Sequence, residues 1–394
     1  MKYSRSIAIA FITLILSLTF SLKACALPQI KAEDRLFQNI QLELLGEYIL
    51  PNNTEFEKTI VGGLSGMTYS PKDDTYFAVS DDRSDRNPAR VYQFKLKLDD
   101  QMKPQGIEFL KVITLQDEAG NPYAQGKIDA EGIAITPQGT IWVTSEGDAK
   151  QDLPPFIREF DPKTGKLLRD LFYPDHYVPK TDKEGNRQGI QNNLGFEALS
   201  LSANAARLGA TEPYRLFTAA EADLTQDKPD RKQDEGAPIE GARARVMHYY
   251  VEQNRVDLVG EYLYQLESRP MGSEKYGLPE LLSIDGAGRF LSLERTVGIT
   301  GFKIKVFQFV FAGAKDTSKL PSVKLLPEVV KPVQKELLLD LNTIEDLTLD
   351  NLEGMTLGPR LPDGTQSLIM VSDNNFNKLQ KTQFLVFRIK NFKP

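Results

Sequence analysis

The chain contains few of the residues on which redox and nucleophilic chemistry most often depends. It has one cysteine, one tryptophan and two histidines in 394 residues. The single Cys25 lies in an N-terminal segment typical of an export signal, so we expect the mature chain to have no disulfide and no thiol chemistry. A Ser-His-Asp hydrolase is also disfavoured, because Ser65 in the run GGLSG does not match the G-x-S-x-G spacing.

Neither histidine stands in a pattern typical of catalysis. His248 lies in the run RVMHYYV, where we expect an ordinary strand residue, and His176 lies in a loop, YPDHYVP, where it could bind a ligand. Phosphate-binding loops, dinucleotide fingerprints, HExxH and CxxC are missing from the sequence. Trp142, inside TIWVTSE, is expected in the core rather than against a substrate.

The charge balance argues against nucleic acid as a partner. The formal net charge is −6, and no Lys/Arg-rich tract interleaved with aromatic residues counters it. Long apolar runs are also missing after the N-terminal segment, because no stretch approaches the roughly 20 residues of a membrane-spanning helix. We therefore expect a mature chain with no transmembrane segment, acting as a monomer.

The N-terminus predicts export. Lys2 and Arg5 precede the apolar run Ile7–Phe20, and Ala24-Cys25-Ala26 fits a small-x-small cleavage site. We expect residues 1–26 to be a signal peptide and residues 27–394 to form a single domain in the periplasm or outside the cell. The alternative is lipid anchoring at Cys25, since Leu22-Lys23-Ala24-Cys25 resembles a lipobox, although its lysine fits poorly.

Short β-type runs recur in units of four along the whole mature chain. The run DAEGIAI at Asp129–Ile135 has close variants in GFEALSL, GLPELLSI and NLEGMTL, and each opens a unit of alternating, β-branched and aromatic segments. Five such units predict an all-β fold, a single β-propeller of four-stranded blades. The fifth unit lacks a fourth strand, and Ile40–Leu50 would supply it and close the ring. A sixth blade hidden in the loops stays possible.

Acidic residues mark the same two places in unit after unit. The first strand of a blade lies innermost and the second runs antiparallel beside it, so the start of one and the end of the other lie at the same mouth of the channel. We predict that the carboxylates at these places converge there and bind metal. The predicted metal ligands are Asp81, Asp82, Glu131, Glu146, Glu197, Glu221, Glu280, Glu294, Glu353 and Asp373.

So many like charges need cations among them. Nearby arginines, including Arg83, Arg158 and Arg295, are one source, and bound divalent ions are the other. Carboxylates with asparagine and backbone carbonyl oxygens are the ligands that Ca²⁺ prefers. The simpler alternative is that each acid caps a turn or pairs with an arginine of a neighbouring blade. Gly132 and Gly354 are explained by close backbone approach near the axis.

Four segments together resemble one known family. GLSGMTYSPKDDTYFAVSDDR, DAEGIAITPQGTIWVTSEGD, the pair NLGFEALSLS and YRLFTAAEAD, and NLEGMTLGPRLPDGTQSLIMVSDNNF are similar to the phytase-like family, described as "esterase-like activity of phytase". The resemblance covers roughly Leu42 to Ile389. It implies an exported β-propeller that hydrolyses phosphomonoesters with the help of calcium.

The resemblance also implies roles for individual residues. Asp81, Asp82, Glu131, Glu197, Glu353 and Asp373 would bind the metal, Arg83 and Arg295 would hold the phosphate of a small-molecule ester, and Glu131 and Glu353 would be catalytic. The chain lacks the Asp-Asp-Pro-Ala segment of well-characterised propeller phytases, which leaves phytate open as substrate. Two alternatives remain: a non-catalytic, calcium-stabilised binding module, and a lactonase-like carboxylic ester hydrolase.

Overall fold

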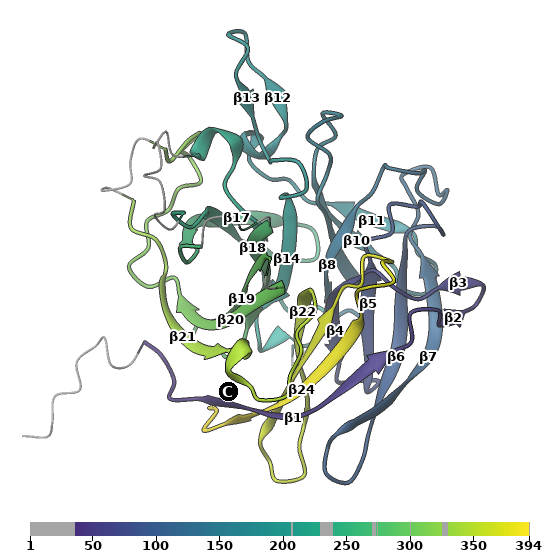
Figure 1. Ribbon diagram of the computed structural model, residues 1–394. Helices are drawn as coiled ribbons and strands as arrows, with labels where there is room; N and C mark the ends of the chain where they lie inside the picture. Colours follow the sequence, from purple (N-terminus) through teal and green to yellow (C-terminus); the bar gives the residue numbers. More distant parts are fainter. Residues whose placement is uncertain are drawn as a thin grey trace, which may run out of the picture. The chain divides into compact units, whose positions relative to one another are not determined.

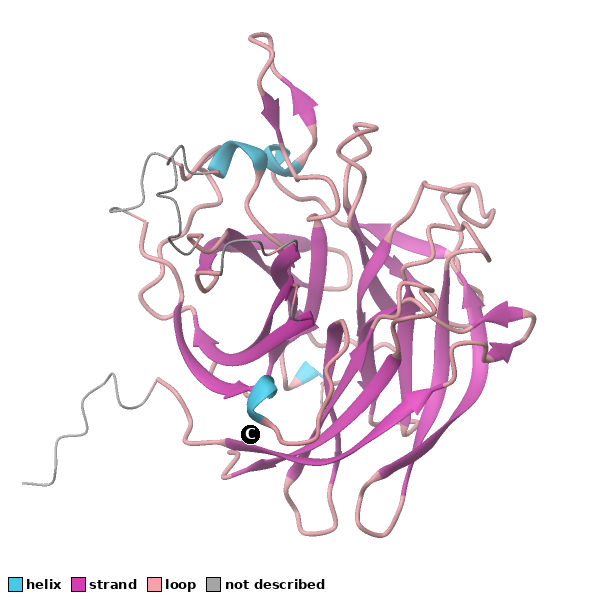
Figure 2. Cartoon of the chain, in the orientation of Figure 1, coloured by secondary structure: helices cyan, strands magenta, loops and turns pink. Residues whose placement is uncertain are grey.

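The computed structural model of the chain describes residues 36–205, 208–228, 239–269, 273, 275–299, 301–324 and 330–393. The predicted signal peptide, residues 1–26, and Cys25 lie outside these residues. The residues from Gln38 onward form one unit, which is described below. It is all-β, apart from short 3₁₀ turns, and its strands form five four-stranded antiparallel sheets arranged as the blades of a propeller (Figures 1 and 2).

The blades follow one another along the chain, from the innermost strand outward. Blade 1 comprises β4 (Leu64–Ser70), β5 (Thr75–Ser80), β6 (Arg90–Leu98) and β7 (Pro104–Thr114). Blade 2 comprises β8 (Ala130–Ile135), β9 (Ile141–Ser145), β10 (Phe156–Phe160) and β11 (Leu167–Asp170). Blade 3 comprises β14 (Phe196–Leu201), β15 (Tyr214–Ala220), β16 (Arg243–Val251) and β17 (Val256–Gln265). Blade 4 comprises β18 (Lys275–Ser283), β19 (Arg289–Gly298), β20 (Gly301–Val310) and β21 (Gln334–Asp340).

Blade 5 joins the two ends of the chain, as the sequence predicted. It comprises β22 (Leu352–Arg360), β23 (Gln366–Ser372), β24 (Thr382–Lys390) and β1 (Gln41–Leu50). The strand from the N-terminal side pairs antiparallel with β24, with Leu42 opposite Ile389. No sixth four-stranded sheet occurs in the part of the chain that the structure describes. Nor is any helix in that part long and apolar enough to cross a membrane.

Turns and small hairpins connect the blade strands. β23 ends at Ser372, and Asn375 and Phe376 adopt φ of 46° and 50° in the turn that follows. The connection between blades 2 and 3 carries a 3₁₀ turn, η2 (Asp175–Tyr177), and a small hairpin. That hairpin is β12 (Lys180–Thr181) and β13 (Arg187–Gln188), and a similar one is β2 (Glu55–Phe56) and β3 (Thr59–Ile60).

The hydrophobic cores lie mainly between neighbouring blades. Trp142 is fully buried among side chains of blades 2 and 3, and its Nε1 donates to the Tyr214 hydroxyl at 2.8 Å, which confirms its predicted place in the core. His248 stacks on Phe217, with ring centroids 4.6 Å apart. Burial, with the nearby charge of Arg215, lowers the pKa of His248 to about 4, so it is a neutral packing residue.

The inner strands approach one another too closely for side chains at some positions. A Cβ placed on Gly132 would lie 2.7 Å from the Cβ of Leu199, and one on Gly354 would lie 2.8 Å from the backbone oxygen of Ser65. Both glycines therefore permit the close approach that was expected near the axis. The same packing places neighbouring inner strands against one another around the ring: β4 against β8 and β22, β14 against β8 and β18, and β18 against β22.

Candidate functional site

A polar cavity of about 510 Å³ lies where the inner strands begin and the second strands end. Its wall combines residues from the starts of β8, β14, β18 and β22 with residues just after β5 and β23. Six of the predicted metal ligands line it. They are Asp81, Asp82, Glu131, Glu197, Glu353 and Asp373. The repeat of acids along the sequence is thus a convergence of acids in space.

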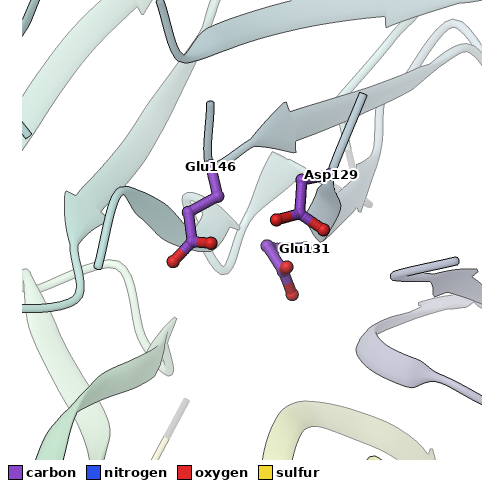
Figure 3. A group of neighbouring side chains, drawn as sticks. All are labelled: Asp129, Glu131 and Glu146. Carbon is purple, nitrogen blue, oxygen red and sulfur yellow. The ribbon is translucent and has the colours of Figure 1, made fainter. Parts of the chain in front are cut away.

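Two further predicted ligands, Glu146 and Glu221, do not line the cavity but lie next to acidic residues that do. Glu146 is within reach of Asp129 and Glu131 on one side, and of Glu197 and Glu221 on the other. In each of these two triads the carboxylate oxygens lie within 4.8 Å of one another, and all the residues are buried. Figure 3 shows Asp129 and Glu131, from the start of the first strand of blade 2, together with Glu146, from the end of its second strand.

We refer to eight of these carboxyl groups as the carboxylate cluster. Its members are Asp81, Asp129, Glu131, Glu146, Glu197, Glu221, Glu353 and Asp373. Four cationic side chains accompany them: Arg83, Arg86, Lys275 and Arg295. The cluster therefore carries several more negative than positive charges if every group is ionised. A buried excess of this size requires bound protons or bound cations.

Arg295 neutralises the inner part of the cluster. Its Nη2 is 2.6 Å from Glu221, and its Nη1 pairs with Glu353 and donates to Asn351 Oδ1 at 2.7 Å. The guanidinium is almost entirely buried. Although it lines the cavity, where the sequence predicted a phosphate ligand, its terminal nitrogens are taken up by protein oxygens. Its observed contacts are those of a residue that holds carboxylates in place.

Arg83 lies nearer the mouth of the cavity. It forms an ion pair with Asp129, lies 3.7 Å from Glu146 and donates to Asn193 Oδ1 at 2.9 Å. Its side chain is 38% exposed, so part of the guanidinium remains accessible from the cavity. Arg86 and Lys275 are exposed at the same rim. These three cations are the groups that an incoming anion meets first.

Three carboxyl groups of the cluster have no hydrogen-bond donor within the described part of the chain. Asp81 Oδ1 is buried without a partner, and the carboxylates of Glu131 and Glu197 accept no hydrogen bond there. Burial, followed by the charges of Glu353 and Asp129, raises the pKa of Asp81 to about 8. Burial and neighbouring carboxylates also raise the pKa values of Glu131 and Glu197 well above the usual range.

The same two causes act elsewhere in the cluster. Burial, together with Asp129 and Glu221, raises the pKa of Glu146 well above its usual range, and burial, together with Asp81 and Glu353, does so for Asp373. Each of these groups therefore gives up its proton less readily than an ordinary carboxyl group does. A bound cation would favour their charged forms and lower these pKa values again.

Asp82 lines the cavity but is already satisfied by the protein. Its carboxylate accepts backbone N–H groups of residues 85, 86 and 87, at 2.9 to 3.1 Å, and pairs with the buried Arg90 at 2.7 Å. These contacts fit the alternative interpretation, in which an acid at a strand end caps a turn and pairs with an arginine. Asp82 shapes the loop that carries Arg83 and Arg86.

Glu280 and Glu294, also predicted as metal ligands, are not brought to the cavity wall. Glu280 accepts backbone N–H groups of Leu199 and Leu281 and so links inner strands. Glu294 accepts from the Tyr264 hydroxyl at 2.8 Å and pairs with Lys335. Successive strand side chains point to opposite faces, and in β19 the cavity position belongs to Arg295.

Several residues of the cavity wall were not among the predicted site residues. Asp129 is the first residue of the DAEGIAI run, so its signal was present, but its neighbour Glu131 was chosen instead. Asn193, Lys275 and Phe376 come from loops or the strand start, where the sequence gives no comparable pattern. The Phe376 ring lies against Arg86, whose Cζ is 5.0 Å from the ring centroid.

His176, the other candidate ligand, lies in a separate buried network. Its Nε2 is 2.8 Å from Glu261 Oε2, which also accepts from the Tyr177 hydroxyl. Burial opposes ionisation of Glu261, but the hydrogen bond from His176 and the charge of Arg245 outweigh it and lower the pKa of Glu261 to about 2. Arg245 pairs with Glu261 and Asp227, all three being fully buried. This network ties loops to blade 3.

The fold and cavity define a five-bladed propeller with an acidic channel mouth. A profile of the phytase-like family, "esterase-like activity of phytase", matches residues 59–376, which is most of the chain. The chain therefore belongs to the phytase-like family.

One curated relative is an uncharacterized secreted protein of Arthroderma benhamiae. It is 29% identical over 146 residues, which cover 32% of this chain and 26% of the relative, so the match spans about a quarter of the relative's length.

Solved structures with a similar arrangement include an endo-arabinase from Bacteroides thetaiotaomicron. It is 9% identical, with 82% of this chain and 93% of that chain covered and a TM-score of 0.37. The catalytic domain of a GH62 α-L-arabinofuranosidase from Coprinopsis cinerea is 10% identical, with 90% and 97% covered and a TM-score of 0.39.

Proposed function

We propose that the protein is an exported, calcium-dependent hydrolase of phosphoric monoesters that acts at the carboxylate cluster. The observation that carries this proposal is the excess of buried carboxyl groups over cationic side chains in one cavity. Membership of the phytase-like family and the secreted relative support it.

The residues of the cluster fit a calcium ion. Calcium takes several hard oxygen ligands from carboxylates and amides in flexible geometry. Asp81, Glu131 and Glu197 offer oxygens that no protein donor occupies, and they face the same cavity. Asp373 and Asn375 add oxygens from the loop after β23. A bound ion would offset the repulsion that raises the pKa values of these groups.

An anionic ester requires this neutralisation in order to enter. A cavity with several unpaired carboxylates repels phosphate, whereas the same cavity holding divalent cations attracts it. Bound calcium would supply a Lewis acid for the phosphoryl oxygens and lower the pKa of water. Arg83, Arg86 and Lys275 are placed at the mouth to hold the phosphate by charge-assisted hydrogen bonds.

Two carboxyl groups have contrasting environments that suit different tasks. Glu131 has no hydrogen-bond donor within the described residues, so its carboxylate is free to accept a proton from the attacking water. Glu353 is held by Arg295 and by Asn351 Nδ2, which donates at 2.9 Å, so its orientation stays fixed. In this proposal Arg295 positions Glu353 and Glu221 and does not bind phosphate.

The test is turnover of p-nitrophenyl phosphate by the mature chain, with calcium and then with a chelator. We expect turnover that needs calcium, and a decrease in kcat of about 100-fold or more in Glu131→Gln, as for loss of a general base. Glu294→Gln is the matched control, because it also removes a buried carboxylate, but one outside the cavity. Its kcat should stay within a few-fold of the native value.

Two results would replace the proposal with another function. A calcium-induced rise in melting temperature, without turnover of any phosphomonoester or diester, would make the protein a calcium-stabilised binding module. Calcium-dependent turnover of carboxylic esters but not phosphoric esters would make it a lactonase-like hydrolase.

A further inference from the structure

A second cavity, of about 430 Å³, lies at the opposite ends of the same inner strands. The acidic cavity uses the starts of these strands, whereas the second cavity is lined by the ends of β4, β8, β14, β18 and β22 and by the turns that follow them. The two cavities share no lining residue within the described part of the chain. The channel therefore has two chemically different mouths.

The floor of this cavity is an apolar ring with one residue from each blade. Its members are Met67, Ile133, Leu199, Leu282 and Met355. Each lies two positions after the repeat marker of its unit, the markers being Ser65, Glu131, Glu197, Glu280 and Glu353. The strand repeat that places acids at one mouth thus places aliphatic side chains towards the other. Further apolar side chains, Leu201 and Leu357 among them, extend the wall outwards.

The hydroxyl groups in the wall are used to join neighbouring inner strands. Thr68 Oγ1 accepts from the backbone N–H of Ile135 at 3.3 Å, and Ser200 Oγ accepts from that of Ser283 at 3.0 Å. Ser283 Oγ in turn accepts from the backbone N–H of Ala203 at 3.2 Å. These contacts leave the aliphatic side chains as the main surface that the wall offers to a ligand.

The acidic group of the wall is also satisfied. Asp285 accepts from Gln38 Nε2 at 2.8 Å, from Arg289 Nη1 at 3.0 Å and from the backbone N–H of Ala287 at 2.9 Å. Asp285 therefore presents no unneutralised charge to the cavity. Arg360, the other charged residue of the wall within the described part of the chain, is exposed and donates to the Gly364 carbonyl oxygen at 3.0 Å. The chemistry of this mouth is the reverse of that at the acidic cavity.

We propose that this second cavity is a binding site for a neutral, largely apolar small molecule, which packs against the aliphatic floor. Small-molecule sites are typically concave, mostly apolar and roughly 300–1,000 Å³ in volume, which includes the volume found here. A dry apolar cavity of about 150 Å³ is enough to hold benzene, so a ligand of two or three rings, or an equivalent aliphatic chain, fits this one. The site acts independently of the hydrolysis proposed above.

The test uses N-phenyl-1-naphthylamine, a neutral apolar fluorophore, titrated into the folded mature chain. We expect saturable binding with one site per chain and a blue-shifted emission. Leu357→Asp, which places a charge in the wall, should weaken binding at least about tenfold, equivalent to about 1.4 kcal/mol. Leu168→Asp is the matched control: Leu168 is a 48% exposed leucine on the outer strand β11, and its substitution should leave binding unchanged.

A second variant guards against loss of folding. Ser202→Trp adds a large side chain at the partly exposed edge of the cavity. It should weaken binding of the dye, because the indole ring fills part of the space that the dye would occupy. A cooperative thermal unfolding transition reports whether each variant is folded. Absence of saturable dye binding by the native chain, or equal affinity in the Leu357, Ser202 and Leu168 variants, would overturn the proposal.

Discussion

Arg295 is the residue through which two carboxyl groups of the cluster are neutralised at once. Arg295 is buried and contacts Glu221 and Glu353 directly. Its side chain points to the channel axis because successive side chains of a strand such as β19 point to opposite faces, so no distortion of the backbone is needed. Removing one partner of a buried ion pair leaves an uncompensated charge, which usually costs more than the pair itself contributes.

We predict that Arg295→Met lowers the free energy of unfolding by about 3–5 kcal/mol at neutral pH without divalent cations. The loss should be smaller near pH 5, where the abandoned carboxyl groups take up protons instead. Urea denaturation at the two pH values measures it. Arg255→Met, which removes the partner of Asp257 in an exposed pair, is the control and should cost less than about 1 kcal/mol. Equal losses in the two variants would contradict this account.

Gly63 makes room for the two side chains that form the cavity edge. Its φ is +62°, and a Cβ there would overlap Asp81 Oδ1 and lie 2.6 Å from the Phe376 ring. Gly364 has a similar φ, +82°, but a Cβ on this residue would have no neighbouring atom within 4 Å among the described residues. Comparing alanine substitutions at Gly63 and Gly364 therefore separates two contributions to the loss of stability: the strain of a positive φ, which both share, and the steric clash, which only Gly63 has.

We predict that Gly364→Ala costs roughly 1 kcal/mol of stability, from its positive φ alone, and that Gly63→Ala costs a further 1–3 kcal/mol from overpacking. Gly63→Ala should also weaken calcium binding, because it displaces Asp81. Urea unfolding and calcium titration of both variants check this. Equal stability of the two variants, with calcium affinity unchanged, would show that Gly63 does not shape the site.

At the scale of the element, β1 decides whether the ring is closed. It occupies the outermost place in blade 5, which β7, β11, β17 and β21 fill in the other blades, but it comes from the opposite end of the chain. Leu44 in β1 stands opposite Phe387, and Leu337 in β21 stands opposite Phe307. Both positions lie on an outer strand, but only the first joins the two ends of the domain.

We predict that Leu44→Pro destabilises the protein by about 3 kcal/mol or more and promotes aggregation, because it opens the ring and exposes the edge of β24. Leu337→Pro also breaks pairing on an outer strand, but it should leave the ring closed and the unfolding transition cooperative. Thermal unfolding and limited proteolysis compare them. The importance of closure is refuted if the two variants unfold alike.

Most elements, and this closure, could be predicted from the sequence because each strand is a short apolar run between turn residues. The run Ile40–Leu50 belonged to none of the five units, and the last unit lacked a fourth strand, so the sequence predicted that this run completes the last blade. The site could be predicted only in part. Glu131, Glu197 and Glu353 could be predicted as cavity residues because each lies at the start of the first strand of its blade. Whether a neighbouring side chain also faces the axis depends on strand register and on bulges, which the sequence does not specify.

Blade 4 shows why the remaining residues could not be assigned. The first strand of every blade has a register shift at the equivalent point, but in blade 4 the side chain of Glu280 accepts backbone N–H groups of Leu199 and Leu281 instead of entering the cavity. In its second strand Arg295, rather than Glu294, faces the axis. Loop residues such as Asn193 and Phe376 reach the cavity through turns whose conformation no local pattern specifies.

At the scale of the whole molecule, the cluster should make stability depend on pH when calcium is absent. Seven of its carboxyl groups have raised pKa values in the folded protein: Asp81, Asp129, Glu131, Glu146, Glu197, Glu221 and Asp373. The pKa of Asp81 is raised to about 8, against about 4 in an unfolded chain. Between these values the folded state binds more protons than the unfolded state. Stability is therefore higher at the acidic end of this range and is lost as pH rises towards 8.

We predict that, in a chelator, the melting temperature falls as pH rises from 5 to 8, with each differentially bound proton contributing up to about 1.4 kcal/mol per pH unit. Glu261, whose pKa is lowered to about 2, changes charge below this range. His248, whose pKa is lowered from 6.5 to about 4, opposes the decline between pH 5 and 6.5, but by one proton at most. Calcium should abolish the decline by taking the place of the protons. A melting temperature that is constant or rises over this range in chelator would contradict the prediction.

The most direct measurement is a calorimetric titration of calcium into the chelated mature chain at pH 7, in two buffers of different ionisation enthalpy. The carboxylate cluster predicts that calcium binds, that binding releases protons, and that a Glu131→Gln, Glu197→Gln double variant weakens it at least about tenfold, equivalent to about 1.4 kcal/mol. Glu294→Gln should bind as the native chain does. Absence of binding, or binding without proton release that the double variant leaves unchanged, would contradict the central claim that this cavity exchanges protons for a divalent cation.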